Sequence, residues 1–170
     1  MTMFLVLRVL HILLAAVWVG ATVSTTFFFV PAIKEAQAAG GQVMGNVMKR
    51  GYSMVMTSIA GLVMLTGLYL YHHYTQGFDP IISGSMGGRV FGTGGLAGIL
   101  ATVIASGIGR KARKAVALMQ QAGPMHTDAE KSALMQQAAA LQGSMATANK
   151  ITLVLMVIAV VTMSVGHYVG

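Results

Sequence analysis

The sequence contains no cysteine and very few acidic residues, and both absences exclude classes of protein. Without cysteine the chain has no thiolate nucleophile, no cysteine-ligated iron–sulfur cluster and no thioether attachment for haem. Its four acidic residues all lie outside the long apolar stretches: Glu35, Asp79, Asp128 and Glu130. The sequence therefore offers no buried carboxylate for proton or cation antiport. It also offers no paired carboxylates or Ser-His-Asp set for hydrolysis.

Charged residues of either sign are scarce, whereas apolar residues are abundant. Charged residues make up 9% of the chain and hydrophobic residues 55%, a balance typical of an integral membrane protein. Four apolar stretches lie near residues 3–30, 52–74, 88–109 and 150–169, and each has roughly the 20 residues that a helix needs to cross a bilayer. None shows the alternation of a barrel strand. We predict an all-α protein, a single four-helix transmembrane bundle over residues 1–170.

The longest polar connection, residues 110–149, has the composition of a helix because it is rich in Ala, Gln, Met and Lys. A Gly-Pro pair interrupts it directly after Ala122. Thr127 and Glu130 then have the spacing of a capping box, which starts a helix near Asp128. We expect the third and fourth helices to extend from the membrane as a helical hairpin that breaks at this pair.

The string ALMQQA occurs once on each arm of this hairpin, at 117–122 and 133–138. It is either a coincidence of composition or a Met-lined docking surface. Within the third span, small residues recur every four positions, which is typical of close helix packing. They are Gly94, Gly98, Thr102 and Ser106.

The net charge of +7 is distributed as membrane topology requires, which argues against nucleic acid as a partner. Basic residues concentrate in the first and third connections: Lys34, Lys49, Arg50, Arg110, Lys111, Arg113, Lys114, Lys131 and Lys150. Only Arg8 and Arg89 fall on the other side. The positive-inside rule then places the hairpin in the cytoplasm and both termini outside. We expect a multi-pass protein of the inner (plasma) membrane of a prokaryote.

Four of the five histidines fall at the outer level of the predicted bundle: His11, His72, His73 and His167. Ionisable side chains in a span usually face the bundle interior, so we expect His11 to point inward from the same helix face as Arg8. In the second span we favour His72 over His73, because its helical stripe contains small residues. Alternatively, His72, His73 and His167 are interfacial residues in a belt with nearby tyrosines.

Imidazoles from facing helices can hold a haem b. We expect His11 as one axial ligand and His72 as the second, with His73 and His167 as the other candidates. Arg8 and Arg89 would then pair with the two haem propionates. A copper site formed by His11, His72 and His167 is the alternative.

The first helix resembles that of a known group of membrane proteins. The stretch LHILLAAVWVGATVSTTFFFVPAI resembles the opening helix of the copper-resistance D-like (CopD-like) family and of the related HemJ-like family. The residues and motifs that carry this resemblance are His11, Trp18, Gly20, Pro31, LTGLYL at 65–70 and GRKARK at 109–114. It implies a four-helix membrane fold in which the first-helix histidine, here His11, is a haem or metal ligand.

These observations predict a membrane cytochrome b-like protein that transfers electrons near the outer membrane face. Its expected partners are the lipid bilayer, quinol and an outer-face acceptor, and it would act as a homodimer or as a subunit of a larger complex. Two alternatives stay open. One is a cofactor-free accessory subunit that scaffolds a membrane complex through its glycine stripe and hairpin, and the other is a copper-binding or copper-transport protein.

Overall fold

The computed structural model describes residues 2–122, 127–166 and 168–169, with the side chains of residues 34, 37 and 38 left out. Within these ranges the chain is helical and has no strand. The elements are α1 (Thr2–Ser24), the π-helical turn η1 (Thr25–Phe29), α2 (Val30–Glu35), α3 (Gln37–Lys49), α4 (Tyr52–Tyr74), α5 (Pro80–Gly84), α6 (Met86–Ala122) and α7 (Asp128–Gly166).

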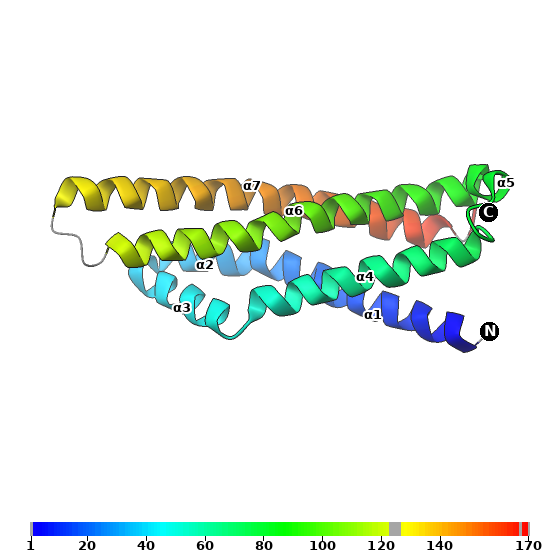
Figure 1. The fold of residues 1–170 in the computed structure, drawn as a ribbon, viewed down its shortest axis with the longest axis horizontal. Coiled ribbons are helices and arrows are strands. Elements are labelled where there is room, and N and C mark those ends of the chain that lie inside the picture. The colour runs from blue at the N-terminus through cyan, green and yellow to red at the C-terminus, as the bar shows by residue number, and fades with distance from the viewer. Residues whose placement is uncertain (1, 123–126, 167, 170) are drawn as a thin grey trace.

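Four segments of the described chain are long and apolar enough to cross a membrane: Thr2–Ile33, α4, α6 and α7. They form a bundle in which α1 lies antiparallel to α4, and α6 lies antiparallel to α7 (Figure 1). Both chain termini and α5 lie at one end, here named the terminal end (Figure 1). At the opposite end, the hairpin end, α6 and α7 extend beyond the other helices. The predicted all-α four-helix membrane bundle is confirmed.

The hairpin arms end and begin where the sequence predicts. The third spanning helix, α6, ends at Ala122, and the fourth, α7, begins at Asp128. The Thr127 hydroxyl donates to the Glu130 carboxylate, and the backbone N–H of Lys131 donates to the Thr127 carbonyl at 3.2 Å. Helix α7 therefore begins where the capping spacing predicts, although the two side chains bond to each other and not to the backbone N–H groups of a capping box. The Gly-Pro pair lies outside the described residues.

The connection between the first two spans contains a helix, α3, that the composition of that stretch did not lead us to expect. It ends at Lys49, and the chain then turns sharply through Gly51, whose φ of +82° suits a glycine. The N–H of Gly51 donates to the Met48 carbonyl at 3.0 Å, which satisfies an otherwise unpaired helix-end oxygen. This turn leads directly into α4 and sets where the second span begins.

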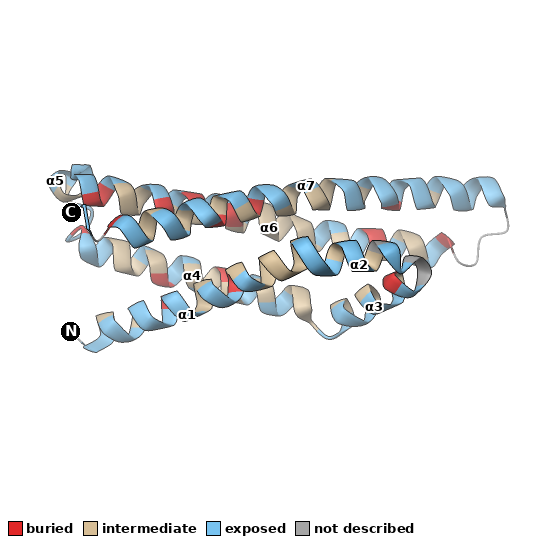
Figure 2. Ribbon diagram, turned by 180° about the vertical axis from the view of Figure 1, so that it is seen from behind, coloured by how far each residue is buried: buried red, intermediate tan, exposed pale blue. Residues whose placement is uncertain are grey.

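Each spanning helix contributes one residue to the buried centre of the bundle. Trp18, Ala60, Ala101 and Met156 are all buried and form one cluster. The two alanines leave room for the indole and the thioether, so that the helices approach closely at this level. Much of the rest of the spans is exposed (Figure 2). Many of these exposed residues are large and apolar, as contact with lipid requires.

The small-residue stripe of α6 packs only in part as predicted. A Cβ atom on Gly94 would lie 2.6 Å from the Thr162 hydroxyl of α7, so this glycine is required for the close approach of α6 and α7. A Cβ atom on Gly98 would meet nothing within 4 Å. The stripe therefore has one residue that determines packing and one that faces open space.

We predict that Gly94→Val lowers the free energy of unfolding by about 1–3 kcal/mol, because the added atoms overpack against Thr162. The matched control is Gly98→Val, which places the same side chain on the same helix without a neighbour. Unfolding in mixed detergent micelles measures both. Equal destabilisation of the two variants would contradict the assigned packing.

Candidate functional site

The buried histidine of α1 is hydrogen-bonded to α4. His11 is 9% exposed, and its Nδ1 lies 3.1 Å from the Val63 carbonyl oxygen and 3.0 Å from the Thr66 hydroxyl oxygen. A carbonyl oxygen only accepts, so Nδ1 carries the proton and donates to Val63. The Thr66 hydroxyl in turn donates to the Leu62 carbonyl at 2.7 Å. We name this arrangement of His11, Val63 and Thr66 the His11 clamp.

The clamp leaves the second ring nitrogen of His11 with a lone pair. In a neutral imidazole one nitrogen donates and the other accepts, so Nε2 is the acceptor. It makes no hydrogen bond with the described residues. A histidine that binds a metal commonly donates its other nitrogen to a carbonyl oxygen, which fixes the tautomer and the ring orientation. His11 has this arrangement.

A glycine of α4 makes room for the His11 ring. A Cβ atom on Gly67 would lie 2.9 Å from Cε1 of His11, so a larger residue there would displace the imidazole. Trp18 lies two turns deeper on α1 and is also buried, whereas Arg8, one turn nearer the terminal end, is exposed. The inward orientation expected for His11 is thus present in the structure, and that of Arg8 is not.

The two histidines at the end of α4 lie apart from His11. His73 is exposed and its ring centroid lies 4.6 Å from that of Phe4 of α1. His72 is exposed and contacts Phe78 edge-on at 5.1 Å. They follow Thr66 by six and seven residues, which is about 9 and 10.5 Å along the helix axis. In this arrangement neither imidazole shares a ligand position with His11.

The expected inward orientation of His72 is wrong, and the reason is the helix face that α1 selects. The His72 stripe also contains Leu65, which is 68% exposed. The face of α4 that meets α1 instead contains Val63, Thr66 and Gly67. The face of α4 that packs on α1 therefore combines the hydrogen-bond partners of His11 with the glycine that makes room for its ring.

The remaining predicted site residues lie at the terminal end or outside the description. His167 lies outside the described residues. Arg8 and Arg89 are exposed, and neither side chain makes a hydrogen bond or ion pair with the described part of the chain. Both guanidinium groups are therefore free to bind an anionic group. Residues 2–122, 127–166 and 168–169 contain no cluster of three His, Cys, Asp or Glu side chains that could hold a metal ion.

Two further interhelical hydrogen bonds were not anticipated from the sequence. The Thr25 and Tyr52 hydroxyls lie 3.0 Å apart and join η1, which follows α1, to the start of α4. The Tyr71 hydroxyl donates to the Gly88 carbonyl of α6 at 3.3 Å. Tyr71 belongs to the tyrosine belt that the sequence suggested, but it ties two helices together.

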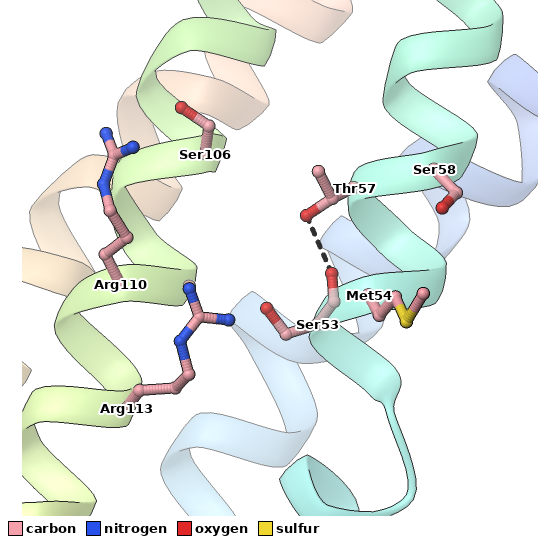
Figure 3. A pocket seen from close by; sticks show the side chains of 8 residues that line it. Ser53, Met54, Thr57, Ser58, Ser106, Arg110 and Arg113 are labelled. Atoms are coloured by element: carbon pink, nitrogen blue, oxygen red, sulfur yellow. Dashed lines mark hydrogen bonds between the residues drawn. The ribbon is translucent and has the colours of Figure 1, made fainter.

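Two cavities lie nearer the hairpin end. The larger, of about 510 Å³, lies between α4 and α6 (Figure 3). The smaller, of about 310 Å³, is lined by Thr26, Val30, Pro31, Ala146, Asn149 and Lys150. Neither is lined by a histidine, so the imidazoles and these cavities are separate features.

Comparison with known proteins adds nothing to this description, since no family model, curated protein or solved structure matches the chain.

We predict that Thr66→Val lowers the free energy of unfolding by about 0.6–2 kcal/mol, because it removes an interhelical hydrogen bond inside the membrane. The matched control is Thr93→Val. Thr93 donates only to the Arg89 carbonyl of its own helix, at 2.8 Å. Unfolding in mixed micelles compares the two, and a control as destabilised as Thr66→Val would remove the clamp as the cause.

Proposed function

We propose that this protein binds one haem b within the membrane through His11 and takes part in electron transfer. The observation that carries the proposal is the His11 clamp, which holds a neutral imidazole in one orientation with the Nε2 lone pair free. Bound there, haem b would supply a one-electron iron centre. In the wider hypothesis quinol is the donor, an outer-face protein is the acceptor, and the chain acts as a homodimer or as part of a larger complex.

The residues around His11 fit this role in part. Val63 and Thr66 fix the ring, and Gly67 makes space for it. Arg8 lies one turn nearer the terminal end, exposed and with no described partner, where it can neutralise a carboxylate. His72 does not reach the same position, so the proposal assigns only His11 to the iron.

A cofactor-free accessory subunit is the second candidate, and one specific observation favours it. The His11 clamp joins α1 to α4 by itself, because polar side chains in a membrane bind helices together without any cofactor. In this case Nε2 would have no function, and the glycine packing of α6 on α7 would serve assembly. The presence or absence of a haem spectrum separates the two candidates.

We predict that the detergent-purified protein shows a Soret band that sharpens on dithionite reduction. His11→Ala is expected to abolish haem retention while the protein still inserts, because the only proposed ligand is lost. His73→Ala is the control and keeps the pigment, since that ring contacts Phe4 and not His11. Pyridine hemochrome and metal analysis of one sample measure haem and copper together. A colourless wild type, or a pigmented His11→Ala, would overturn the haem proposal.

The orientation of the bundle belongs to the same proposal. Six basic residues lie on the hairpin arms or at the start of the fourth span: Arg110, Lys111, Arg113, Lys114, Lys131 and Lys150. The terminal end has Arg8 and Arg89. By the positive-inside rule the hairpin lies in the cytoplasm, so the His11 clamp lies toward the outer face. A prokaryotic inner membrane is the location that this orientation supports.

Since the chain has no cysteine, single-cysteine variants can report this orientation without background. We predict that Ile81→Cys, at an 84% exposed position in α5, reacts with a membrane-impermeant maleimide on intact cells. Gln137→Cys, exposed on the hairpin, is expected to react only after permeabilisation. The reverse pattern would place the hairpin outside.

A further inference from the structure

The larger cavity, between α4 and α6, combines positive charge with hydroxyl groups. It is lined by Ser53, Met54, Thr57 and Ser58 of α4, and by Ser106, Gly109, Arg110 and Arg113 of α6. In Figure 3 the Arg113 side chain points across the gap toward Ser53, while Arg110 runs back along α6 toward Ser106. Two guanidinium groups and several hydroxyls from two helices thus border one space.

The charged groups of this cavity have no protein partner within the described chain. Neither Arg110 nor Arg113 makes a side-chain hydrogen bond or ion pair with the described residues. The Ser53 and Ser58 hydroxyls also make no hydrogen bond there, whereas Thr57 donates to the Ser53 carbonyl at 2.8 Å. The cavity therefore has hydrogen-bond donors without partners and two positively charged guanidinium groups. No carboxylate lines it.

A glycine keeps the cavity open. A Cβ atom on Gly109 would lie 2.6 Å from Oγ of Ser53, so any larger residue would displace that hydroxyl. Serine at 53 and 106 likewise leaves volume that a larger side chain would fill.

The cavity also lies where polar and apolar surfaces meet. Ser53 belongs to the first turn of α4, and Arg110 follows the predicted end of the third span. Along the face of α6 that contains Arg110, Val103 is 60% exposed and Leu96 is 58% exposed. Residues seven apart share a helix face, so a guanidinium group stands at the end of an exposed aliphatic stripe. A ligand that fits this arrangement has an anionic head and a hydrocarbon tail.

We propose that this cavity binds the phosphate group of an anionic phospholipid, with an acyl chain along the stripe of Val103 and Leu96. Guanidinium groups match phosphate oxygens through paired hydrogen bonds, and basic cavities between membrane helices bind anionic head groups. The Ser53 and Ser58 hydroxyls supply two further donors. This site is independent of the haem proposal, since none of its residues belongs to the His11 clamp.

The test must separate this site from general attraction of basic residues to anionic lipid, and the chain supplies a matched control. Arg110→Gln with Arg113→Gln removes both charges of the cavity. Lys111→Gln with Lys114→Gln removes two charges from the same turns of α6 at exposed positions that do not line the cavity. Both double variants have the same net charge, so general attraction affects them equally.

The measurement is the thermal stabilisation of delipidated protein in detergent on titration with dioleoylphosphatidylglycerol, dioleoylphosphatidylcholine or inorganic phosphate. For the wild type we expect saturable stabilisation by phosphatidylglycerol. We expect about a tenfold or greater loss of apparent affinity in the arginine double variant, and little change in the lysine control.

Equal losses in both double variants, or no loss in either, would overturn the proposal. Equal stabilisation by inorganic phosphate would assign the cavity to a soluble phosphate instead, and equal stabilisation by phosphatidylcholine would remove the role of charge.

A second variant tests the cavity with both arginines present. Ser106→Leu fills the space without changing charge, and its matched control is Ser164→Leu on α7, an exposed serine whose hydroxyl likewise donates to its own helix. We expect the cavity variant to lose binding of phosphatidylglycerol and the control to keep it. Should the arginine variant fail to fold, this pair decides, and full lipid affinity in Ser106→Leu would overturn the proposal.

Discussion

The hydrogen bonds between His11 of α1 and α4 fix how the first span sits in this bundle. Inside a bilayer, lipid is as apolar as leucine, so burial of apolar side chains does not by itself hold helices together. The Nδ1 proton of His11 pairs with the Val63 carbonyl and with Thr66, and this pairing sets the rotation of α1. With that rotation Trp18 enters the central cluster and Arg8 faces outward.

The sequence predicted what depends on composition and local signals. Four spans follow from apolar runs, and the ends of the hairpin arms follow from a Gly-Pro pair and a capping box, with α6 ending at Ala122 and α7 beginning at Asp128. The choice between His72 and His73 depended on a tertiary contact. The stripe of His72 contains the small residues, but the stripe of His73 contains Thr66, whose hydroxyl bonds to His11 and therefore faces α1. The sequence therefore predicted the inward-facing residue of α1, His11, but not the residues of α4 that face it.

The helix pairs of the bundle are joined by different means. Glycine packing joins α6 to α7 at Gly94, where a Cβ would meet Thr162. Hydrogen bonds join α1 to α4, and a single tyrosine hydroxyl, that of Tyr71, ties α4 to α6 near the terminal end. At the other end of that pair two arginines, Arg110 and Arg113, face small hydroxyl side chains without a carboxylate among the described residues. These groups border the larger cavity between α4 and α6.

The second spanning helix, α4, contributes to both the His11 clamp and the larger cavity. Ser53, in the first turn of α4, lines the cavity. Thr66, whose hydroxyl bonds to His11, follows thirteen residues later, about 20 Å along the helix axis. A helix of this length turns as a rigid body more readily than it twists, since its backbone hydrogen bonds resist local change. A rotation of α4 that brought His72 toward α1 would carry Thr66 away from His11 and Ser53 away from Arg113. The His11 clamp and the cavity are thus separate sites on one helix, whose rotation places Thr66 toward His11 and Ser53 toward Arg113.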